Sequence, residues 1–470
     1  MEPRLTLRPV QEINCQQIMR EPATLLAGRL GSGKTTVAVE AVFRTQSINK
    51  SVFVVAPRNT EQGWRKSVRR QYQQDDFFNR IDSTKSGKQA MADLWSGVDG
   101  WYFITWEYFR ARPVHFWAKL NVDVVIADEV HRMQNRNSKT WTHMRGLGKK
   151  SKRIAMSGTP QGNNMQGLWT TLRWLFPENE NDGLYTTPLS FWRWVADWLL
   201  VEEDEWLGFV SVLGEKYEPG TMLSYYRSYI RETDHNEVPP VNDIEIFVSM
   251  NAEQKRLYKQ VQEESIAWLN TPDPMTGKKP MVSELPMTTR IRLRQITLGV
   301  PIINDNNKVS YAVDTISSKI DAALEELADL PEGEPVLVFT HSREFALVAA
   351  KRFCNAGYPA FAWVGGTSDK VRQSVLAGWG TQGGNQVVVA VISAIAEGTD
   401  GLQYKCAEEI WLSEDESRII NEQARGRLPR DGQKRVVNRR MIIVPGTYDQ
   451  KIIDKHLAAM LESNKSLRGK

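Results

Sequence analysis

Two stretches of the chain alternate short apolar runs with segments of helical pattern, and this alternation limits the possible fold more than any other feature. The first stretch contains the apolar runs Thr24–Ala27, Ser51–Ala56, Tyr102–Thr105, Val122–Ala127 and Arg153–Met156. The second contains Val336–Phe339, Ala360–Val364, Val387–Ile392, Glu409–Leu412 and Met441–Val444. Continuous apolar runs of this length suit strands that are buried on both faces. Strand–helix alternation that occurs twice predicts an α/β fold with two tandem parallel-sheet lobes.

The helical segments and the lobe boundaries follow from the same pattern. The pattern is helical in Thr35–Arg44, Arg343–Asn355 and Asp449–Leu461, among other segments. Residues 178–240 differ from both stretches, because they are rich in Trp, Tyr and acidic side chains. We therefore expect an N-terminal lobe at residues 1–177, a helical insertion at 178–240 and a C-terminal lobe at 241–470.

Composition and cysteine use indicate an ordinary soluble protein. Hydrophobic residues make up 41% of the chain and charged residues 25%, which argues against a mostly disordered chain. Cys15, Cys354 and Cys406 are too widely spaced for a disulfide framework or a CxxC metal site, so we expect a reducing cytoplasm. No apolar run approaches the about 20 residues of a membrane-spanning helix, so we expect no membrane partner.

A glycine-rich segment stands between the first apolar run and the first helical segment. Residues 28–35 read GRLGSGKT and match G-x-x-x-x-G-K-[ST] in full. Glycines allow consecutive N–H groups to turn toward phosphates, and a helix N-terminus adds partial positive charge. An unrelated glycine turn is the alternative, and the flanking strand and helix disfavour it. We expect ATP to be bound by Gly28, Gly31, Ser32, Gly33, Lys34, Thr35 and Thr36, with Lys34 on the β- and γ-phosphates and Thr35 on Mg²⁺.

Two carboxylates follow the apolar run that ends at Ala127. Ligands bind at the carboxyl ends of parallel strands, and Asp128 and Glu129 stand there. We expect Asp128 to hold Mg²⁺ and Glu129 to orient and deprotonate the attacking water. A solvated acidic turn would be the favoured reading of this pair alone, but the glycine-rich segment upstream makes it the weaker one.

The second stretch has no glycine-rich loop of this kind, but it carries arginines in Gln423–Arg430. Arginine side chains brought across a cleft can neutralise the transferred phosphoryl group, which is worth about 10³–10⁵ in rate. Arg427 and Arg430 are the candidates. Spacing alone leaves this role and a basic surface turn equally open.

Further short segments, in order, make the chain resemble helicase superfamily two, and within it the Swi/Snf-type double-stranded DNA translocases. The matching segments are Leu7–Gln11, Val54–Pro57 with Trp64, Ile104–Glu107, Asp128–His131, Ser157–Pro160, Phe339–Ser342, Glu397–Gln403 and Gln423–Arg430. Weaker matches are Tyr229–Thr233, Gln254–Tyr258, Leu293–Gln295 and Ser317–Ile320. The chain departs from the family pattern at Gly28 and Arg29, where an acidic pair is usual, and at Pro429, where His is common.

The resemblance implies two RecA-like lobes and assigns further roles to individual residues. It implies that Gln11 reads adenine and that Gly398 and Asp400 also contact the nucleotide. It implies that Ser157, Thr159 and Gln423 couple the nucleotide to the nucleic acid. The residues implied to contact the nucleic-acid backbone are Arg65, Thr105, Thr340, Ser342 and Thr399.

Basic runs and tryptophans leave alternatives open. Because the net charge is only +4, phosphate binding needs local basic patches. Residues 65–70 and 149–153 are candidate patches, and solvated surface is the equal alternative. We interpret the tryptophans at 169–206 mostly as packing residues, since a translocase on duplex DNA has little use for base stacking.

The sequence thus predicts a nucleic-acid-dependent ATPase that moves along DNA, with ATP and Mg²⁺ as cofactors. We expect a monomer on DNA, with RNA a less favoured partner, in the cytoplasm at the nucleoid or, for a viral protein, in the host cell. One alternative is an RNA or single-strand unwinding helicase of the same superfamily. Another is a nucleotide-gated DNA clamp with little turnover.

Overall fold

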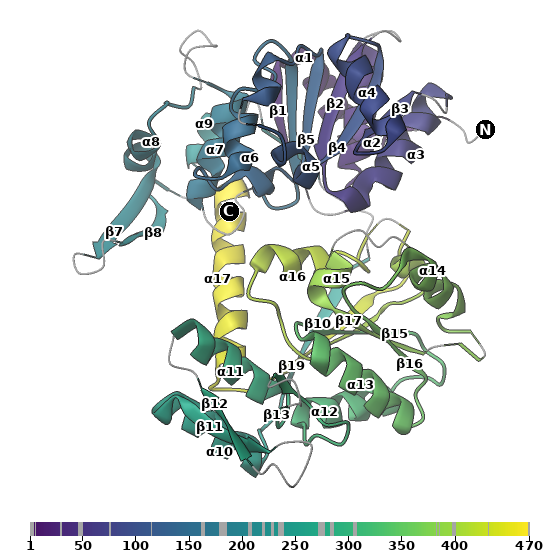
Figure 1. Cartoon of the computed structure of the whole chain (residues 1–470), viewed down its shortest axis with the longest axis vertical. Helices are drawn as coiled ribbons and strands as arrows, with labels where there is room; N and C mark the ends of the chain where they lie inside the picture. Colours follow the sequence, from purple (N-terminus) through teal and green to yellow (C-terminus); the bar gives the residue numbers. More distant parts are fainter. Residues whose placement is uncertain are drawn as a thin grey trace. The chain divides into compact units, whose positions relative to one another are not determined.

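A computed structural model describes most of the chain: residues 4, 6–28, 31–45, 50–74, 77–113, 115–160, 165–177, 186–204, 209–218, 221–226, 230–233, 239–270, 278–282, 286–303, 308–381, 383–384, 386–396, 401–430 and 432–468. The chain divides into two compact units, residues 1–236 with 460–470 and residues 237–459. Each unit is built on its own parallel sheet (Figure 1).

The sheet of the first unit has the strand order β3-β4-β2-β5-β6-β1-β9 over the described residues, and every pairing is parallel. Its strands are β1 (Ala23–Gly28), β2 (Ser51–Ala56), β3 (Phe78–Ile81), β4 (Gly100–Thr105), β5 (Val124–Asp128), β6 (Lys152–Ser157) and β9 (Ile230–Thr233). Central strands such as β2 are buried at every position, as the continuous apolar runs predict.

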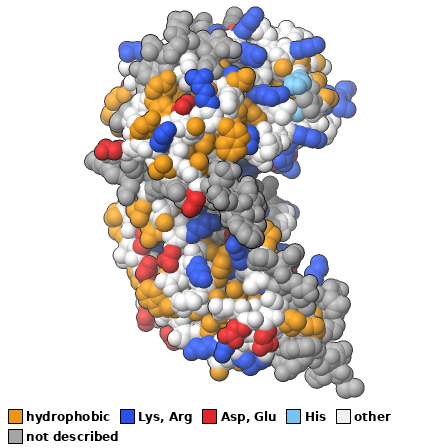
Figure 2. Space-filling view, turned by 90° about the vertical axis from the view of Figure 1, so that its left-hand side faces the viewer, with side chains coloured by type: hydrophobic (Ala, Val, Ile, Leu, Met, Phe, Trp, Pro, Cys, Tyr) orange, Lys and Arg blue, Asp and Glu red, His pale blue; other side chains and the backbone are white. Residues whose placement is uncertain are grey.

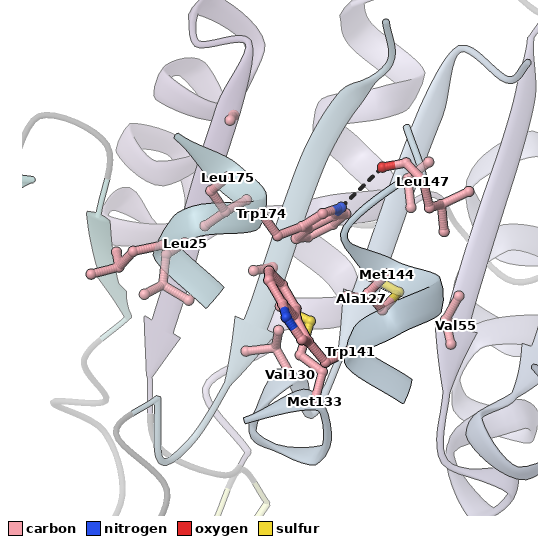
Figure 3. Packing of buried hydrophobic residues seen from close by; sticks show 14 of the residues in the cluster. Leu25, Val55, Ala127, Val130, Met133, Trp141, Met144, Leu147, Trp174 and Leu175 are labelled. Atoms are coloured by element: carbon pink, nitrogen blue, oxygen red, sulfur yellow. Dashed lines mark hydrogen bonds between the residues drawn. The ribbon is translucent and has the colours of Figure 1, made fainter. Parts of the chain in front are cut away.

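Helices cover both faces of this sheet because successive strand residues point to opposite sides. One core layer joins Val52 and Val54 to α1 (Pro9–Arg20), α2 (Lys34–Thr45) and α3 (Glu61–Tyr72). The other joins Phe53 and Val55 to α4 (Lys85–Trp95), α5 (Trp106–Arg110), α6 (Lys139–Met144) and α7 (Leu168–Leu175). In the second layer Trp141 and Trp174 lie against the sheet, and the Trp174 indole donates to the Leu147 carbonyl at 3.0 Å (Figure 3).

The sheet of the second unit has the order β10-β19-β18-β15-β17-β16 and is also parallel throughout its described strands. Its strands are β10 (Val241–Phe247), β15 (Val336–Thr340), β16 (Ala360–Trp363), β17 (Val387–Val391), β18 (Glu408–Trp411) and β19 (Val437–Ile443). The helices α12 (Ser318–Ala328) and α13 (Arg343–Asn355) pack on one face. On the other face lie α14 (Asp369–Gly378), α15 (Ile392–Ala396) and α16 (Arg418–Arg425).

A smaller cluster adjoins this sheet. It combines α10 (Ala252–Glu264) and α11 (Pro286–Leu298) with the antiparallel pairs β11 (Ile266–Asn270)–β12 (Lys278–Val282) and β13 (Ile302–Ile303)–β14 (Val309–Ser310). The last helix is α17 (Tyr448–Arg468). None of the helices in the described ranges combines the length and apolar character that crossing a bilayer requires.

The predicted fold class is confirmed, since every apolar run named above forms a parallel strand. The segment predicted as a helical insertion is only partly helical. It contains α8 (Phe191–Trp198) and α9 (Thr221–Tyr225), but also the antiparallel hairpin β7 (Leu199–Asp204)–β8 (Phe209–Glu215). Its strand β9 pairs with β1 and completes the first sheet. The predicted boundaries at 177 and 240 stay predictions.

The described tryptophans between residues 169 and 206 mostly pack in the core, as interpreted from the sequence. Trp169, Trp174 and Trp194 are buried in the first unit. Trp192 differs, because 49% of it is exposed. Trp206 lies outside the residues that the structure describes.

Candidate active site

The carboxyl ends of the strands in the first unit meet at one edge of the sheet. The register pairs Ala27 of β1 with Ser157 of β6, and Asp128 of β5 with Met156 of β6. It also pairs Ala56 of β2 with Thr105 of β4. The glycine-rich loop after β1, the carboxylates after β5 and the segments after β2, β4 and β6 therefore share this edge, where α/β sheets bind ligands.

The glycine-rich loop leads directly into α2. Gly31 and Gly33 have φ of 79° and 80°, a backbone region that favours glycine. The helix begins at Lys34, whose Nζ folds back to donate to the carbonyl of Gly28 at 2.7 Å. An ammonium held over a loop at the N-terminus of a 12-residue helix is the arrangement that a bound triphosphate needs. These residues fit ATP.

Gln11 lies against the same loop. Its side-chain Nε2 donates to the carbonyl of Ser32 at 3.0 Å, and its Oε1 accepts from the backbone N–H of Arg8 at 3.1 Å. The side chain is buried, with 7% exposed. The contact shows that Gln11 supports the phosphate-binding loop, while its role in reading adenine stays a prediction.

Two indole groups hold Asp128. Trp64 Nε1 donates to the carboxylate Oδ2 at 3.0 Å, and Trp106 Nε1 donates to the backbone carbonyl at 2.9 Å. The backbone N–H of Glu129 donates to Oδ1 at 3.0 Å. Burial, followed by the neighbouring Glu129 charge, raises the pKa of Asp128 to about 6, while Trp64 and Lys34 act in the opposite direction. Burial disfavours the charged form of this carboxylate, and a bound cation such as Mg²⁺ would stabilise that form. The Asp128 side chain therefore fits a metal ligand.

Glu129 is connected to the segment after β6. It has a left-handed backbone, with φ of 50° and ψ of 52°, which is uncommon outside glycine. His131 Nδ1 lies 3.3 Å from Glu129 Oε2 and 3.3 Å from Ser157 Oγ. The Ser157 hydroxyl oxygen accepts from the backbone N–H of Thr159 at 3.0 Å. This chain of contacts joins the carboxylates to Ser157 and Thr159, for which the coupling role stays a prediction.

The residues predicted to contact nucleic acid in the first unit have structural roles as well. Thr105 caps α5 by accepting from the N–H of Tyr108 at 3.2 Å. The Arg65 guanidinium lies 4.8 Å from the ring centroid of Phe78 and pairs with Glu61 at 3.3 Å. Contact of either residue with nucleic acid remains a prediction.

The basic run at 149–153 lies at the other edge of the sheet, because Lys152 begins β6 and pairs with Val124, which begins β5. Lys152 Nζ donates to two backbone carbonyls at 2.6 and 3.1 Å, and Arg153 is buried and donates to the carbonyl of Trp174. Neither side chain is simply solvated surface, because both bind backbone carbonyls within the unit, and phosphate binding by this run stays a prediction. A cavity of about 470 Å³ at this edge is lined in part by Lys50, Lys150 and Lys152.

The distribution of surface charge differs between the units on one visible face. Lys and Arg side chains are spread over the first unit in Figure 2, whereas Asp and Glu side chains gather mainly over the second. A small net charge therefore coexists with a locally basic surface, which phosphate binding requires.

In the second unit, one predicted nucleic-acid contact conflicts with the structure. Thr340 is fully buried, and its hydroxyl lies 3.2 Å from Ser413 Oγ and accepts from the N–H of Ser342 at 3.4 Å. The resemblance implied that this hydroxyl contacts the nucleic-acid backbone, but in the structure it is buried and accepts a hydrogen bond from the turn that follows β15. Ser342 caps α13 by accepting from the N–H of Phe345 at 3.3 Å, and its contact with nucleic acid stays a prediction.

The arginines predicted to act on the phosphoryl group follow α16. Arg427 is buried and donates through Nη2 to the carbonyl of Ala396, which ends α15. Arg430 is partly exposed, and its backbone N–H donates to the carbonyl of Leu428 at 2.9 Å. Gln423 is a partly exposed residue of α16. Gly398, Thr399 and Asp400 lie outside the described residues, so their roles stay predictions.

Sequence reasoning missed two groups of residues. The sequence places Trp64 and Trp106 in matching segments but indicates no part for either in holding Asp128, since no spacing pattern links residues 64 and 106 to 128. It also gave no role to Lys319, which is fully buried and donates to Asp449 Oδ2 at 2.6 Å and to the carbonyls of Leu412 and Ile442. The only sign of this role in the sequence was the position of Lys319 in a helical segment with apolar residues, which could have indicated a buried lysine.

Comparison with known proteins places the chain in a family. A family model described as the SNF2-related domain matches residues 13–298. The ISWI chromatin-remodeling complex ATPase ISW1 of Saccharomyces cerevisiae is 21% identical over 443 residues, which cover 92% of this chain and 38% of that protein. The ISWI chromatin-remodeling complex ATPase CHR11 of Arabidopsis thaliana is 23% identical over 443 residues, which cover 92% of this chain and 40% of that protein.

A solved structure is also similar. The Sulfolobus solfataricus SWI2/SNF2 ATPase core in complex with dsDNA has a TM-score of 0.40 and 17% sequence identity, covering 100% of this chain and 95% of that one. The chain spans about two fifths of the length of the curated relatives that it matches. Since the family model covers more than half of the sequence, the chain belongs to the SNF2-related domain family.

Proposed function

We propose that the chain is a nucleic-acid-stimulated ATPase that couples ATP hydrolysis to movement along double-stranded DNA. One observation carries the proposal: the glycine-rich loop with Lys34 and the buried carboxylates Asp128 and Glu129 share one edge of a parallel sheet. Membership of the SNF2-related domain family supports it. The relatives ISW1 and CHR11 are named as ATPases of ISWI chromatin-remodelling complexes.

The first unit supplies groups that bind the triphosphate and activate water. Backbone N–H groups of the loop and the Lys34 ammonium bind the phosphate oxygens. Thr35 and Asp128 would hold Mg²⁺, which when bound neutralises part of the phosphate charge. Glu129 orients the attacking water and takes its proton. These roles match the donors and acceptors that each side chain carries.

The second unit supplies further positive charge for the phosphates of ATP. We expect Arg427 and Arg430 to stabilise the charge that develops on the transferred phosphoryl group. ATP then favours the state in which both units contact it, because only that state makes both sets of contacts. Hydrolysis removes the γ-phosphate that both sets of residues contact. When the two units bind and release one DNA strand in alternation, the protein moves along that strand.

The decisive comparison measures ATP turnover with different nucleic acids. We expect duplex DNA to stimulate turnover more than single-stranded DNA or RNA of equal length. Greater stimulation by RNA or single strands would favour an unwinding helicase of the same superfamily. Tight duplex binding without stimulated turnover would favour a nucleotide-gated clamp, and Lys34→Ala, which lacks the phosphate-binding ammonium, supplies the background rate.

Movement needs a separate assay, since turnover alone does not report it. A third strand bound in the major groove of a duplex is displaced when a motor passes. We expect ATP-dependent displacement by the wild-type protein and none by Glu129→Gln. Monomeric action on DNA, which we also propose, predicts that the displacement rate per molecule does not depend on protein concentration.

A further inference from the structure

We infer that Trp64 and Trp106 are positioning residues that set the metal-binding carboxylate of Asp128 and tie it to the two segments expected to face nucleic acid. The inference rests on the proposed function and deepens it. In this inference neither indole contacts ATP or the attacking water. Each would act through Asp128 alone.

Trp64 fixes the carboxylate itself. Its side chain is fully buried, and its Nε1 donates to Oδ2 at 3.0 Å, while Oδ1 accepts from the N–H of Glu129 at 3.0 Å. Each oxygen thus receives one donor and keeps a lone pair for a cation. Hydrogen bonds to a metal-binding carboxylate typically orient it, and their loss weakens metal binding about 10–100-fold.

Trp106 fixes the backbone that carries the carboxylate. Its Nε1 donates to the carbonyl of Asp128 at 2.9 Å, and only 1% of the side chain is exposed. Asp128 is the last residue of β5, so this carbonyl lies where the strand ends. The two indoles approach one residue from separate helices, α3 and α5.

Both indoles belong to segments that the resemblance assigns to the nucleic-acid backbone. Trp64 lies in the first turn of α3, next to Arg65, and Trp106 follows Thr105 directly. A buried indole has few rotamers and packs against neighbours on all sides, so a shift of its helix moves its N–H as well. A nucleic-acid contact at Thr105 would therefore lie next in sequence to Trp106, which donates a hydrogen bond to the metal-binding residue Asp128.

The first test measures metal binding without hydrolysis. Mn²⁺ is titrated into the full chain with a non-hydrolysable ATP analogue, and the electron paramagnetic resonance signal of free Mn²⁺ gives the dissociation constant. Trp64→Phe keeps an aromatic ring but loses the donor, and we expect about tenfold weaker binding. Trp174→Phe is the matched control, because this buried indole donates to the backbone carbonyl of Leu147 and not to Asp128 (Figure 3).

The second test measures the connection to nucleic acid. We expect Trp106→Phe to lower the ratio of DNA-stimulated to basal ATP turnover several-fold, and Trp174→Phe to leave it at the wild-type value. Equal Mn²⁺ binding in Trp64→Phe and the wild type, or an unchanged stimulation ratio in Trp106→Phe, overturns the inference. A wild-type chain that neither binds Mn²⁺ with the analogue nor hydrolyses ATP instead overturns the proposed function.

A spectroscopic measurement covers the case in which Trp64→Phe does not fold. The wild-type chain labelled with ¹⁵N at its indoles carries 16 tryptophans. With the analogue bound, we expect addition of Mg²⁺ to shift an indole N–H resonance, because Trp64 donates to the oxygen beside the metal. Indole resonances that all stay in place overturn the inference.

Discussion

The side chain of Gln11 donates through Nε2 to the carbonyl oxygen of Ser32, 3.0 Å away, and thereby fastens α1 to the phosphate-binding loop. The space for this contact exists because residue 33 is glycine. A Cβ added at Gly33 would lie 2.4 Å from Gln11 Nε2, and the φ of 80° there suits no other residue well.

Gly33→Ala should therefore weaken ATP binding by about tenfold or more, since the loop and Gln11 cannot both keep their positions. A fluorescent ATP analogue measures the affinity. Gly97→Ala is the matched control: its φ is 73°, but a Cβ there meets no atom within 4 Å. This control should lose about 1 kcal/mol of stability from backbone strain and keep its ATP affinity.

The buried pair of Lys319 and Asp449 predicts a stability effect in the second unit. Lys319→Met leaves the Asp449 carboxylate without its cation, and breaking a buried pair costs about 3–5 kcal/mol. Urea unfolding measures the change. Lys259→Met removes an exposed partner of Glu263, 3.9 Å away, and should change the free energy of unfolding by less than about 1 kcal/mol. Equal effects of the two substitutions would contradict a structural role for Lys319.

The raised pKa of Asp128 predicts a pH-dependent need for Mg²⁺. Burial and the Glu129 charge raise this pKa from 3.8 to about 6, so the folded chain holds the proton at a pH where an exposed Asp has lost it. Protons then compete with the metal as the pH falls through about 6. The Mg²⁺ concentration for half-maximal turnover should rise steeply below that pH and stay level above it. A flat dependence down to pH 5 would be inconsistent with Asp128 as the ligand.

Glu129→Gln should separate binding from hydrolysis. The amide keeps the shape of the side chain but cannot accept the proton of water, so ATP binding should persist while turnover falls by about 10²-fold or more. Single-turnover hydrolysis and nucleotide binding are measured on the same preparation. Glu253→Gln, a change at a partly exposed residue of α10, should leave both unchanged. Wild-type turnover in Glu129→Gln would remove this residue from the mechanism.

The parts of the fold visible in the sequence are those whose local pattern is unambiguous. Residues 51–56 are apolar throughout and form a strand buried at every position. The loop between β1 and α2 was equally clear, because glycines and Lys34 stand at fixed spacing. The hairpin β7–β8 was missed because a run of acidic residues, Glu202 to Asp204, hides its strand character.

Long-range contacts account for what the sequence could not predict. Burial of Thr340 depends on Ser413, 73 positions away, and the Trp64 bond to Asp128 spans 64 positions. β9 pairs with β1 from about 200 positions further along the chain, and its pattern of Ile, Arg, Glu and Thr shows no continuous apolar run. Only the folded chain brings such residues together.

The Arg427→Ala variant tests the proposal that arginine of the second unit stabilises the phosphoryl group of ATP bound by the first. The measurement is single-turnover ATP hydrolysis on duplex DNA, with Arg435→Ala, a half-exposed arginine of the same unit, as the control. We expect Arg427→Ala to bind ATP but to hydrolyse it about 10³-fold or more slowly, while Arg435→Ala matches the wild type. Hydrolysis by Arg427→Ala at the wild-type rate would contradict it.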